Sequence, residues 1–241
     1  MSTAWPHVFM YHAVTPTDDS QGLCVSPERF EEHMSYLKQR GLRGVSMREL
    51  YRAARVGDAR GLVGLTFDDG YRDFRENALP MLQSFGFSAT VFAVAGMLGK
   101  ENSWVEADEE PSPLMPLMDA DELRDLARHR VEVGSHTMSH PRLGGLREED
   151  LRREVEDSKS ALEAILEAPV DGFCYPYGSL DAAAVRAVGR AGYAYGCATK
   201  TRAQHNVHDW PRMFIGQKDG PLRLTVKRTV YSPYARLTRN R

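Results

Sequence analysis

The chain has 241 residues with 42% apolar content, which is long enough to bury the core of one domain of the barrel or doubly wound kind. Its 31 Lys and Arg residues nearly balance 33 Asp and Glu residues, so the formal net charge of -2 gives no general attraction to nucleic acid or anionic lipid. Three cysteines without ligand spacing argue against a disulfide framework and for reduced thiols.

The first residues of the chain and its apolar runs indicate in which cellular compartment to expect the protein. The first residues have neither the basic start nor the apolar core of a signal peptide, and no apolar run reaches membrane-spanning length. We therefore expect a cytoplasmic protein without an integral membrane segment, or an exported one if the natural chain carries a leader. Residues 227–241 contain five basic residues and no acid, and we interpret them as a solvated tail.

Short apolar runs alternate with amphipathic segments, which is typical of an α/β fold. Strands are predicted at residues 8–11, 44–46, 62–67, 89–94, 131–134, 172–175 and 194–199. About seven strands with helices between them could close a barrel. We expect one domain over residues 1–241, with its core at about 7–216 and the basic tail after it.

Capping signals mark the helices between these strands. Ser26 and Pro27 begin a helix that ends at Gly41, and a capping box begins another at residues 120–129. Residues 151–165 keep the spacing of an amphipathic helix, and a further helix ends near Gly192. Residues 98–118 are rich in Pro, Glu and Asp without a period, so we expect an insertion loop of the kind that often covers a site.

Two adjacent carboxylates, Asp68 and Asp69, come directly after the predicted strand 62–67 and before Gly70. Catalytic groups of barrels lie at such strand ends. Successive residues there point in different directions, so one carboxylate can bind a metal while its neighbour accepts a proton. A solvated Asp-Asp-Gly turn has the same sequence, and this motif by itself does not separate the two interpretations.

Two histidines, His136 and His140, follow the predicted strand 131–134. A spacing of four residues lets both imidazoles reach one ion. Together with a carboxylate they form a set of three ligands that leaves coordination positions open for water and substrate. Exposed loop histidines are the alternative if the pair is considered in isolation.

Two further predicted strands are followed by candidate site residues: an aromatic turn follows strand 172–175, and His12 follows strand 8–11. The strand 172–175 ends in Pro176, Tyr177 and Gly178, whose backbone N–H groups could face an oxyanion and whose rings could form a cleft wall. An ordinary strand and turn with buried aromatics is the alternative, just as His12 could be a hydrogen-bonded core histidine. The occurrence of all these groups after separate strands favours a functional site.

These motifs resemble those of the polysaccharide deacetylase family, also called carbohydrate esterase family 4 or the NodB-homology domain. The similar segments are TFDDG at 66–70, HTMSHP at 136–141 and YPYG at 175–178, in the family's order and spacing. The resemblance covers roughly residues 7–216. YHAV at 11–14 is nearest to the poly-N-acetylglucosamine deacetylase-like members. The resemblance implies a distorted (β/α) barrel.

The resemblance also implies residue roles. Asp68 would be the general base, the Tyr177 amide an oxyanion donor, and a divalent metal would be bound by Asp69, His136 and His140. Zinc is the default metal, and Co²⁺, Ni²⁺ or Fe²⁺ would fit the same ligands. Many members carry a catalytic-acid histidine in a late Leu-His motif, which is absent here. Members with an N-terminal YHxV segment supply this acid from the start of the barrel, a role that fits His12.

One position departs from the family pattern. The third motif often begins with an arginine that braces the catalytic aspartate, whereas this chain has Cys174, which cannot form a charge-assisted pair. Arg212 is our hypothetical substitute, with a plain surface arginine as the alternative. The predicted substrate-binding group is Arg212, Tyr175 and Trp104. Tyr71, Tyr177 and Trp210 are further aromatics that could stack on sugars, and a place in the core is the equal alternative for each aromatic residue.

The function that follows from the resemblance is metal-dependent removal of acetyl groups from an N-acetylated saccharide or glycoside. Two alternatives remain open. The same metal site could hydrolyse a linear or cyclic amide that is not a sugar, and the fold could have been kept in a sugar-binding module without catalysis. The complete set of predicted site residues argues against the second alternative.

Overall fold

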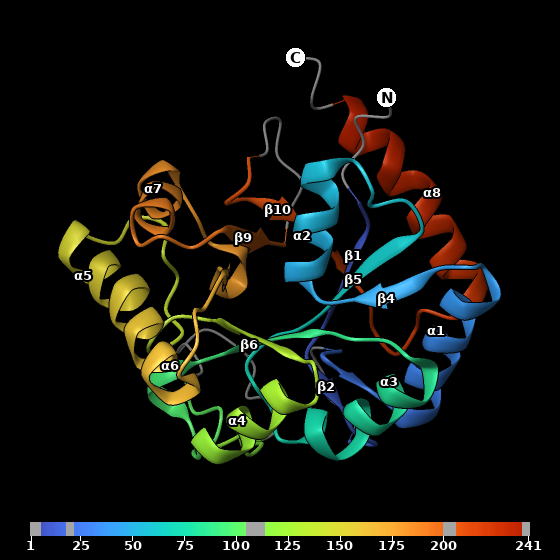
Figure 1. Ribbon diagram of the computed structural model, residues 1–241, viewed down its shortest axis with the longest axis horizontal. Coiled ribbons are helices and arrows are strands. Elements are labelled where there is room, and N and C mark those ends of the chain that lie inside the picture. Colours follow the sequence, from blue (N-terminus) through green and yellow to red (C-terminus); the bar gives the residue numbers. More distant parts are fainter. Residues whose placement is uncertain (1–5, 18–21, 105–113, 200–205, 238–241) are drawn as a thin grey trace.

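The computed structural model describes residues 6–17, 22–104, 114–199 and 206–237 (Figure 1). Its main sheet has parallel strands in the order β10-β9-β8-β7-β6-β5-β1-β11, with β4 also paired to β5. These strands are β1 (Val8–Tyr11), β4 (Arg43–Val45), β5 (Leu62–Phe67), β6 (Thr90–Ala93), β7 (Glu132–Ser135), β8 (Gly172–Cys174), β9 (Tyr195–Ala198), β10 (Trp210–Pro211) and β11 (Met213–Phe214). The short strands β2 (Ala13–Val14) and β3 (Cys24–Val25) form a separate pair.

The sheet nearly closes on itself at Arg212. Strand β10 pairs with β9 at one edge and β11 pairs with β1 at the other, and Arg212 is the residue between β10 and β11. The barrel is distorted because β4 and β6 share one side of β5, β4 at its start and β6 at its end. The predicted distorted (β/α) barrel is confirmed, and each predicted strand lies within one or two residues of an observed one.

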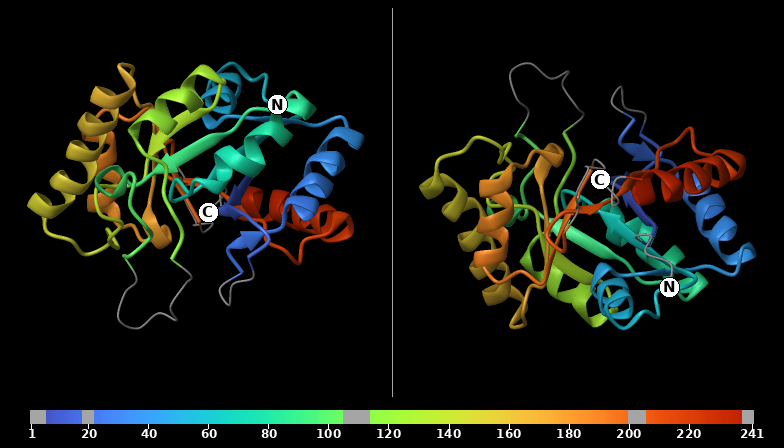
Figure 2. Two further views of the ribbon diagram at one scale, coloured as in Figure 1. Left: turned by 90° about the horizontal axis from the view of Figure 1, so that it is seen from below. Right: turned by 90° about the horizontal axis from the view of Figure 1, so that it is seen from above.

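Helices surround the strands, as Figures 1 and 2 show. They are α1 (Pro27–Gln39), α2 (Met47–Val56), α3 (Leu79–Phe85), α4 (Ala120–Arg128), α5 (Glu148–Arg152), α6 (Ser158–Leu166), α7 (Ala182–Arg190) and α8 (Pro221–Leu237). The predicted N-caps are formed, since Ser26 accepts from the Arg29 N–H and Asp119 forms a capping box with Glu122. The predicted helix 151–165 is divided between α5 and α6 by a π-helical turn, η3 (Arg153–Asp157).

Helix α2 closes the amino-terminal end of the barrel. Its buried residues Met47 and Leu50 pack against interior side chains such as Val8, Tyr195 and Trp210. This end therefore consists of packed apolar side chains. The carboxyl ends of the strands lie at the opposite end of the barrel, where the predicted motifs are found.

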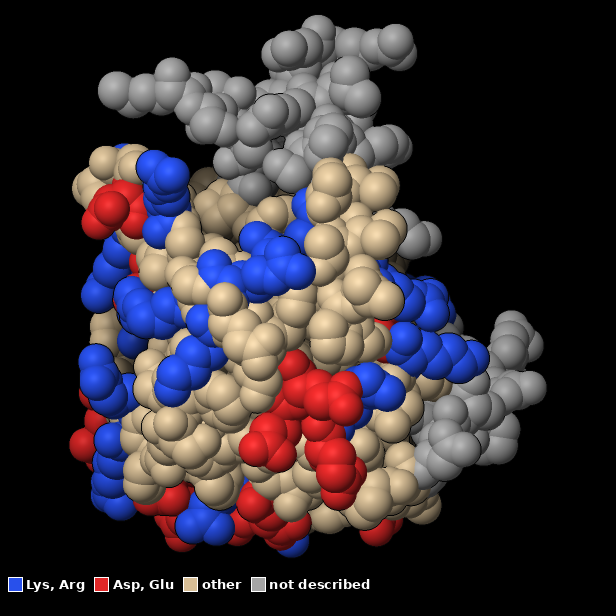
Figure 3. Space-filling view, turned by 90° about the vertical axis from the view of Figure 1, so that its right-hand side faces the viewer, with Lys and Arg blue, Asp and Glu red and all other residues tan. Residues whose placement is uncertain are grey.

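Helix α8 replaces most of the predicted solvated tail. Leu224 is fully buried in the main core, and Thr225 contacts the Tyr36 hydroxyl of α1. The core therefore extends beyond the predicted limit at residue 216. The face with α1 and α8 carries both signs of charge, with a group of acidic side chains near its centre (Figure 3). Among the described helices, none combines the length and the apolar character that a bilayer crossing requires.

A buried histidine joins α1 to the segment before α8. The His33 ring contacts the Tyr11 hydroxyl at 3.2 Å and the Asp219 carbonyl oxygen at 2.5 Å. Burial lowers the pKa of His33 to about 4, so the folded protein keeps this ring neutral where the unfolded chain protonates it. Lowering the pH from 7.5 to 5 is expected to cost about 2 kcal/mol of folding free energy through this residue.

Denaturant unfolding at several pH values tests this expectation, with His33→Gln as the comparison. His7, whose pKa burial also lowers to about 4, stays in both proteins, so the difference in pH dependence belongs to position 33. The variant should show the weaker loss of stability between pH 7.5 and 5. Equal pH dependence in the two proteins would contradict the prediction.

Candidate active site

The predicted site residues leave the sheet together at the carboxyl ends of its strands. Tyr11 of β1 pairs with Phe67 of β5, so His12 and Asp68 follow at the same level. The histidine motif follows β7, and Tyr177 lies in the 3-10 turn η4 (Pro176–Gly178) after β8. A cavity of about 260 Å³ is lined by all the predicted catalytic and metal-binding residues, namely His12, Asp68, Asp69, His136, His140 and Tyr177.

Asp69, His136 and His140 converge on one point. Asp69 Oδ1 lies 3.4 Å from His136 Nε2 and 3.2 Å from His140 Nε2, and this buried oxygen has no hydrogen-bond partner among the described residues. Ligands of tetrahedral zinc, about 2.0–2.2 Å from the ion, are about 3.3–3.5 Å apart, so these separations fit one shared ion. Although burial disfavours its charge, contacts with both histidines hold the pKa of Asp69 well below its usual range.

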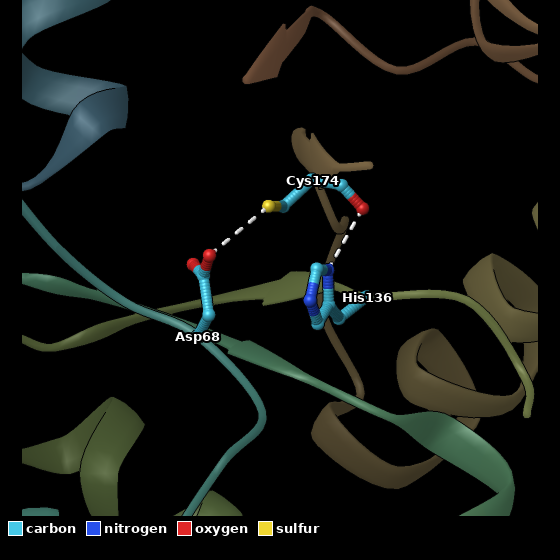
Figure 4. Close-up of side chains that lie close together, drawn as sticks. All are labelled: Asp68, His136 and Cys174. Carbon is cyan, nitrogen blue, oxygen red and sulfur yellow. Dashed lines mark hydrogen bonds between the residues drawn. The ribbon is translucent and has the colours of Figure 1, made fainter. Parts of the chain in front are cut away.

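A second group of potential ligands, Asp68, His136 and Cys174 (Figure 4), shares His136 with the first. Its atoms already serve other contacts: His136 Nδ1 donates to the Cys174 carbonyl at 2.9 Å, and Cys174 Sγ lies 3.6 Å from Asp68 Oδ2. Burial raises the pKa of the Cys174 thiol to about 11, so the sulfur stays protonated at neutral pH. Because His136 Nδ1 donates to this carbonyl, Nε2 is the ring nitrogen that could bind an ion shared with Asp69. The Asp69 group is therefore the candidate metal site.

Arg212 forms a buried ion pair with Asp68. Its Nη1 donates to Asp68 Oδ1 at 2.6 Å and its Nη2 to Oδ2 at 2.7 Å, while Nη1 also contacts Thr66 Oγ1 at 3.0 Å. The cation predicted to replace the third-motif arginine is thus in place, and the alternative of a surface arginine is wrong. Burial opposes the charge on Asp68, but the guanidinium lowers the pKa of this carboxyl. Because the Arg212 side chain has no exposed surface, it braces Asp68 and has no access to a substrate.

Replacing Arg212 by Ala is expected to lower the free energy of unfolding by about 3–5 kcal/mol, because Asp68 would keep a buried charge without its partner. Denaturant unfolding measures this loss. In the double variant Arg212→Ala with Asp68→Asn, the loss should be smaller than the sum of the two single losses. Strictly additive losses would contradict a direct coupling between the two side chains.

Left-handed backbone conformations gather at the site. Asp69, Thr137, His140 and Tyr177 have φ angles of 72°, 71°, 65° and 56°, which side-chain-bearing residues rarely adopt. Such conformations cost free energy and persist where the surrounding structure enforces them, often at functional sites. Gly178 also has a positive φ of 62°, and a Cβ there would come within 1.8 Å of Thr199 Oγ1. Tight turns thus direct the ligand side chains into the cavity.

His12 lies in a segment that is held by hydrogen bonds to side chains of a neighbouring helix. The Val14 N–H donates to Asp73 Oδ1 at 2.9 Å, and the Val14 carbonyl accepts from Asn77 Nδ2 at 2.7 Å. Asp73 and Asn77 belong to the turn and π-helix η1 (Phe74–Ala78) that follow the Asp-Asp motif. His12 Nδ1 has no hydrogen-bond partner among the described residues, which separates His12 from a hydrogen-bonded core histidine.

Two predicted aromatic residues lie beside the histidine ligands. The Trp104 and Tyr177 rings are 4.6 Å and 4.7 Å from the His140 ring, and both line the cavity. Tyr71 lines it too, and its hydroxyl accepts from Asn102 Nδ2 at 3.2 Å. Asn102 and Trp104 belong to the predicted insertion loop, of which residues 105–113 lie outside the described residues.

The substrate-binding prediction for Tyr175 is wrong, and of the two roles left open for Trp210 the structure shows the core one. Tyr175 is fully buried, and its hydroxyl donates to the His208 carbonyl oxygen at 2.8 Å, so its ring has no surface for a substrate. Trp210 lies in the barrel interior, where its ring packs against Tyr51 at a centroid distance of 6.5 Å.

Some cavity residues had no motif to mark them. Met10 and Phe214 line the cavity and pair with each other across β1 and β11. Strand alternation could have found them, since Met10 lies two residues before His12 and Phe214 two residues after Arg212. Leu23 and Thr199 also line the cavity, and their sequence contexts carry no comparable signal.

Comparison with known proteins agrees with the geometry. A family model described as polysaccharide deacetylase matches residues 56–196. The chain belongs to the polysaccharide deacetylase family. The family resemblance seen in the motifs is therefore confirmed.

Relatives in the polysaccharide deacetylase family are longer than this chain. The Bacillus subtilis (strain 168) protein YxkH is 26% identical over 198 residues, which are 81% of this chain and 65% of that protein. The poly-β-1,6-N-acetyl-D-glucosamine N-deacetylase of Escherichia coli (strain K12) is 31% identical over 149 residues, which are 55% of this chain and 21% of that protein. The chain thus spans less than two thirds of either relative.

A solved structure shares the fold. The Streptococcus pyogenes deacetylase PplD, determined in complex with acetate, aligns with a TM-score of 0.79 and 23% sequence identity. The alignment covers 94% of this chain and 98% of that one. The barrel described above therefore shares its fold with that deacetylase over nearly the whole chain.

Proposed function

We propose that this protein is a metal-dependent N-deacetylase that hydrolyses the acetamido group of N-acetylated sugars to acetate and a free amine. One observation carries the proposal: three potential metal ligands, a carboxylate and a histidine line the same cavity. They are Asp69 with His136 and His140, then Asp68, which the buried Arg212 braces from outside the cavity, and His12.

Asp69, His136 and His140 would hold the divalent ion. Zinc is the default for two imidazoles and one carboxylate, and cobalt, nickel or iron(II) suits the same ligands. When bound, the ion supplies Lewis acidity toward the acetamido carbonyl. The hydrogen bond from His136 Nδ1 to the Cys174 carbonyl fixes the tautomer and the orientation that ligation by Nε2 requires.

Asp68 acts as the general base. Its bidentate pair with Arg212 keeps it ionised and prevents rotation of the carboxylate, so an oxygen can accept the proton of the attacking water. We assign the oxyanion contact to the backbone N–H of Tyr177, because this residue lines the cavity and its ring lies next to that of His140. These residues together favour attack at the carbonyl carbon.

His12 completes the reaction as the general acid. An amide nitrogen does not leave as an anion at neutral pH, so the departing amine must receive a proton. His12 follows β1 and Asp68 follows the paired strand β5, which brings the proton donor and the proton acceptor to the same cavity from adjacent strands. The products are acetate and the amino sugar.

The substrate class rests on family relationship and on the cavity. The Escherichia coli relative is named for N-deacetylation of poly-β-1,6-N-acetyl-D-glucosamine, which supports an N-acetylglucosamine unit as the substrate here. The Trp104 and Tyr177 rings next to His140 would stack on the faces of that sugar.

Acetate release tests the proposal. Wild-type protein is incubated with N-acetylglucosamine oligomers and small N-acetylated glycosides, with zinc or cobalt added, and is compared with His136→Ala. His129→Ala is the matched control, because His129 is an exposed histidine that does not line the cavity. Wild type and the control should release acetate, lose activity with a chelator and regain it with added metal, whereas His136→Ala should stay inactive.

Two results would replace the proposal. Turnover of a linear or cyclic non-sugar amide by metal-loaded protein that releases no acetate from any sugar would change the substrate class. Saturable sugar binding without hydrolysis, in protein that contains metal, would indicate a binding module.

A further inference from the structure

The loop between the two histidine ligands is held from both sides. On one side, the N–H groups of Ala95 and Gly96 donate to the carbonyl oxygens of Thr137 and Met138, each at 2.9 Å. On the other side, two backbone N–H groups of the loop donate to a side chain. The N–H groups of Met138 and Ser139 both donate to one carboxylate oxygen of Glu154, again at 2.9 Å each.

Glu154 makes a third contact with this loop. Its other oxygen, Oε1, accepts from the Ser139 hydroxyl at 2.7 Å. The residue is 9% exposed, so the carboxylate is directed inward. One side chain of the helix that follows this loop thus accepts from three donors, all of them in the three residues between His136 and His140.

The π-helical turn η3 places Glu154 at this position. The turn interrupts the helix between α5 and α6, and Glu154 and Val155 are both buried within it. One turn later, the Ser158 hydroxyl contacts the Ser135 hydroxyl at 2.8 Å, directly before the first histidine ligand. The same helical segment therefore contacts the histidine motif in its middle and the residue directly before it. π-Helical turns of this kind often lie at functional sites.

We propose that Glu154 is a positioning residue for the metal site, which sets the loop geometry that brings the His140 and His136 rings onto Asp69. The inference rests on the proposed metal site. Glu154 is not among the described residues that line the cavity, and its hydrogen bonds go to two backbone N–H groups and to the Ser139 hydroxyl, so it acts through the loop. Outer residues that orient metal ligands typically change metal affinity by about 10- to 100-fold when they are removed.

Zinc affinity of the metal-free protein tests the proposal, measured by competition with a chromophoric chelator. Glu154→Ala should bind zinc about 10- to 100-fold more weakly than wild type, because the loop donors lose their acceptors. Glu154→Gln should keep most of the affinity, since the amide oxygen can accept both N–H groups and the Ser139 hydroxyl can turn to accept from the amide nitrogen. Asp157→Ala is the matched control, because this acid lies in the same turn with its side chain exposed.

Thermal unfolding of the metal-free variants separates positioning from general stability. Weaker zinc binding by Glu154→Ala, with rescue in Glu154→Gln and with most of the protein folded at the assay temperature, supports the inference. Equal zinc affinity in Glu154→Ala and Asp157→Ala would overturn it while leaving the proposed function intact, as would a loss that the unfolded fraction fully explains. Absence of zinc binding by wild type would overturn both proposals.

Discussion

Replacement of Asp68 by Asn is expected to lower kcat by about a hundred- to ten-thousand-fold, because the amide cannot accept the proton of the attacking water. Zinc affinity should change little, since Asp68 is engaged by Arg212 and the proposed ligand is its neighbour. Steady-state kinetics of acetate release, together with metal analysis of the same protein sample, measures both quantities.

Asp69→Asn is the matched comparison, with the same chemical change one residue away. This variant should lose zinc affinity, because a buried anionic ligand becomes neutral, and its activity should recover in part when zinc is added in excess. Added zinc should not restore Asp68→Asn. The opposite pattern, with metal lost in Asp68→Asn and retained in Asp69→Asn, would reverse the assignment of base and ligand.

The barrel was predictable from local sequence because its strands are buried on both faces and read as short apolar runs. Strand β5 is an example, since the observed bounds Leu62–Phe67 are those of the predicted run. The strands β10 and β11 were not predicted, because two residues give no period. Their pairing with β9 and β1 depends on closure of the whole sheet, which is a property of the tertiary structure.

Helix α8 shows a different limit. The basic composition and lack of acids of residues 227–241 matched a solvated tail, yet Lys227 pairs with Asp219 at 2.5 Å. Leu224, which precedes those residues in the same helix, is buried in the core. The pairing neutralises charge that the sequence presents as an excess. Tertiary contacts thus turned a segment with a weak local signal into a packed helix.

The candidate site was predictable where chemistry demands particular residue types. Asp68, Asp69 and the two histidines have few substitutes, and the missing arginine at Cys174 directed attention to another cation. Glu154 was not predictable, because it lies in a highly charged segment where neighbouring acids such as Glu149 and Glu156 look the same. What distinguishes Glu154 is the π-helical turn that buries it, and the sequence gives no sign of this turn.

Replacement of His12 by Asn is expected to lower kcat for N-acetylated sugars by about a hundred- to ten-thousand-fold, because the leaving amine would lack its proton donor. Metal content should be unchanged, since His12 is outside the ligand group. The variant should also stay folded, because the hydrogen bonds that hold its segment are made by the Val14 backbone with Asp73 and Asn77. Kinetics, metal analysis and thermal unfolding of one preparation check these three expectations.

An activated acetate ester distinguishes a proton donor from a residue that merely shapes the cavity. A phenolate with a low pKa leaves without protonation, so His12→Asn should hydrolyse an aryl acetate at a rate much closer to that of wild type. Asp68→Asn, which impairs attack by water, should be slow on both the ester and the amide. An equal loss on the two substrates in His12→Asn would mean that His12 acts before the leaving group departs, and another group would then have to supply the proton.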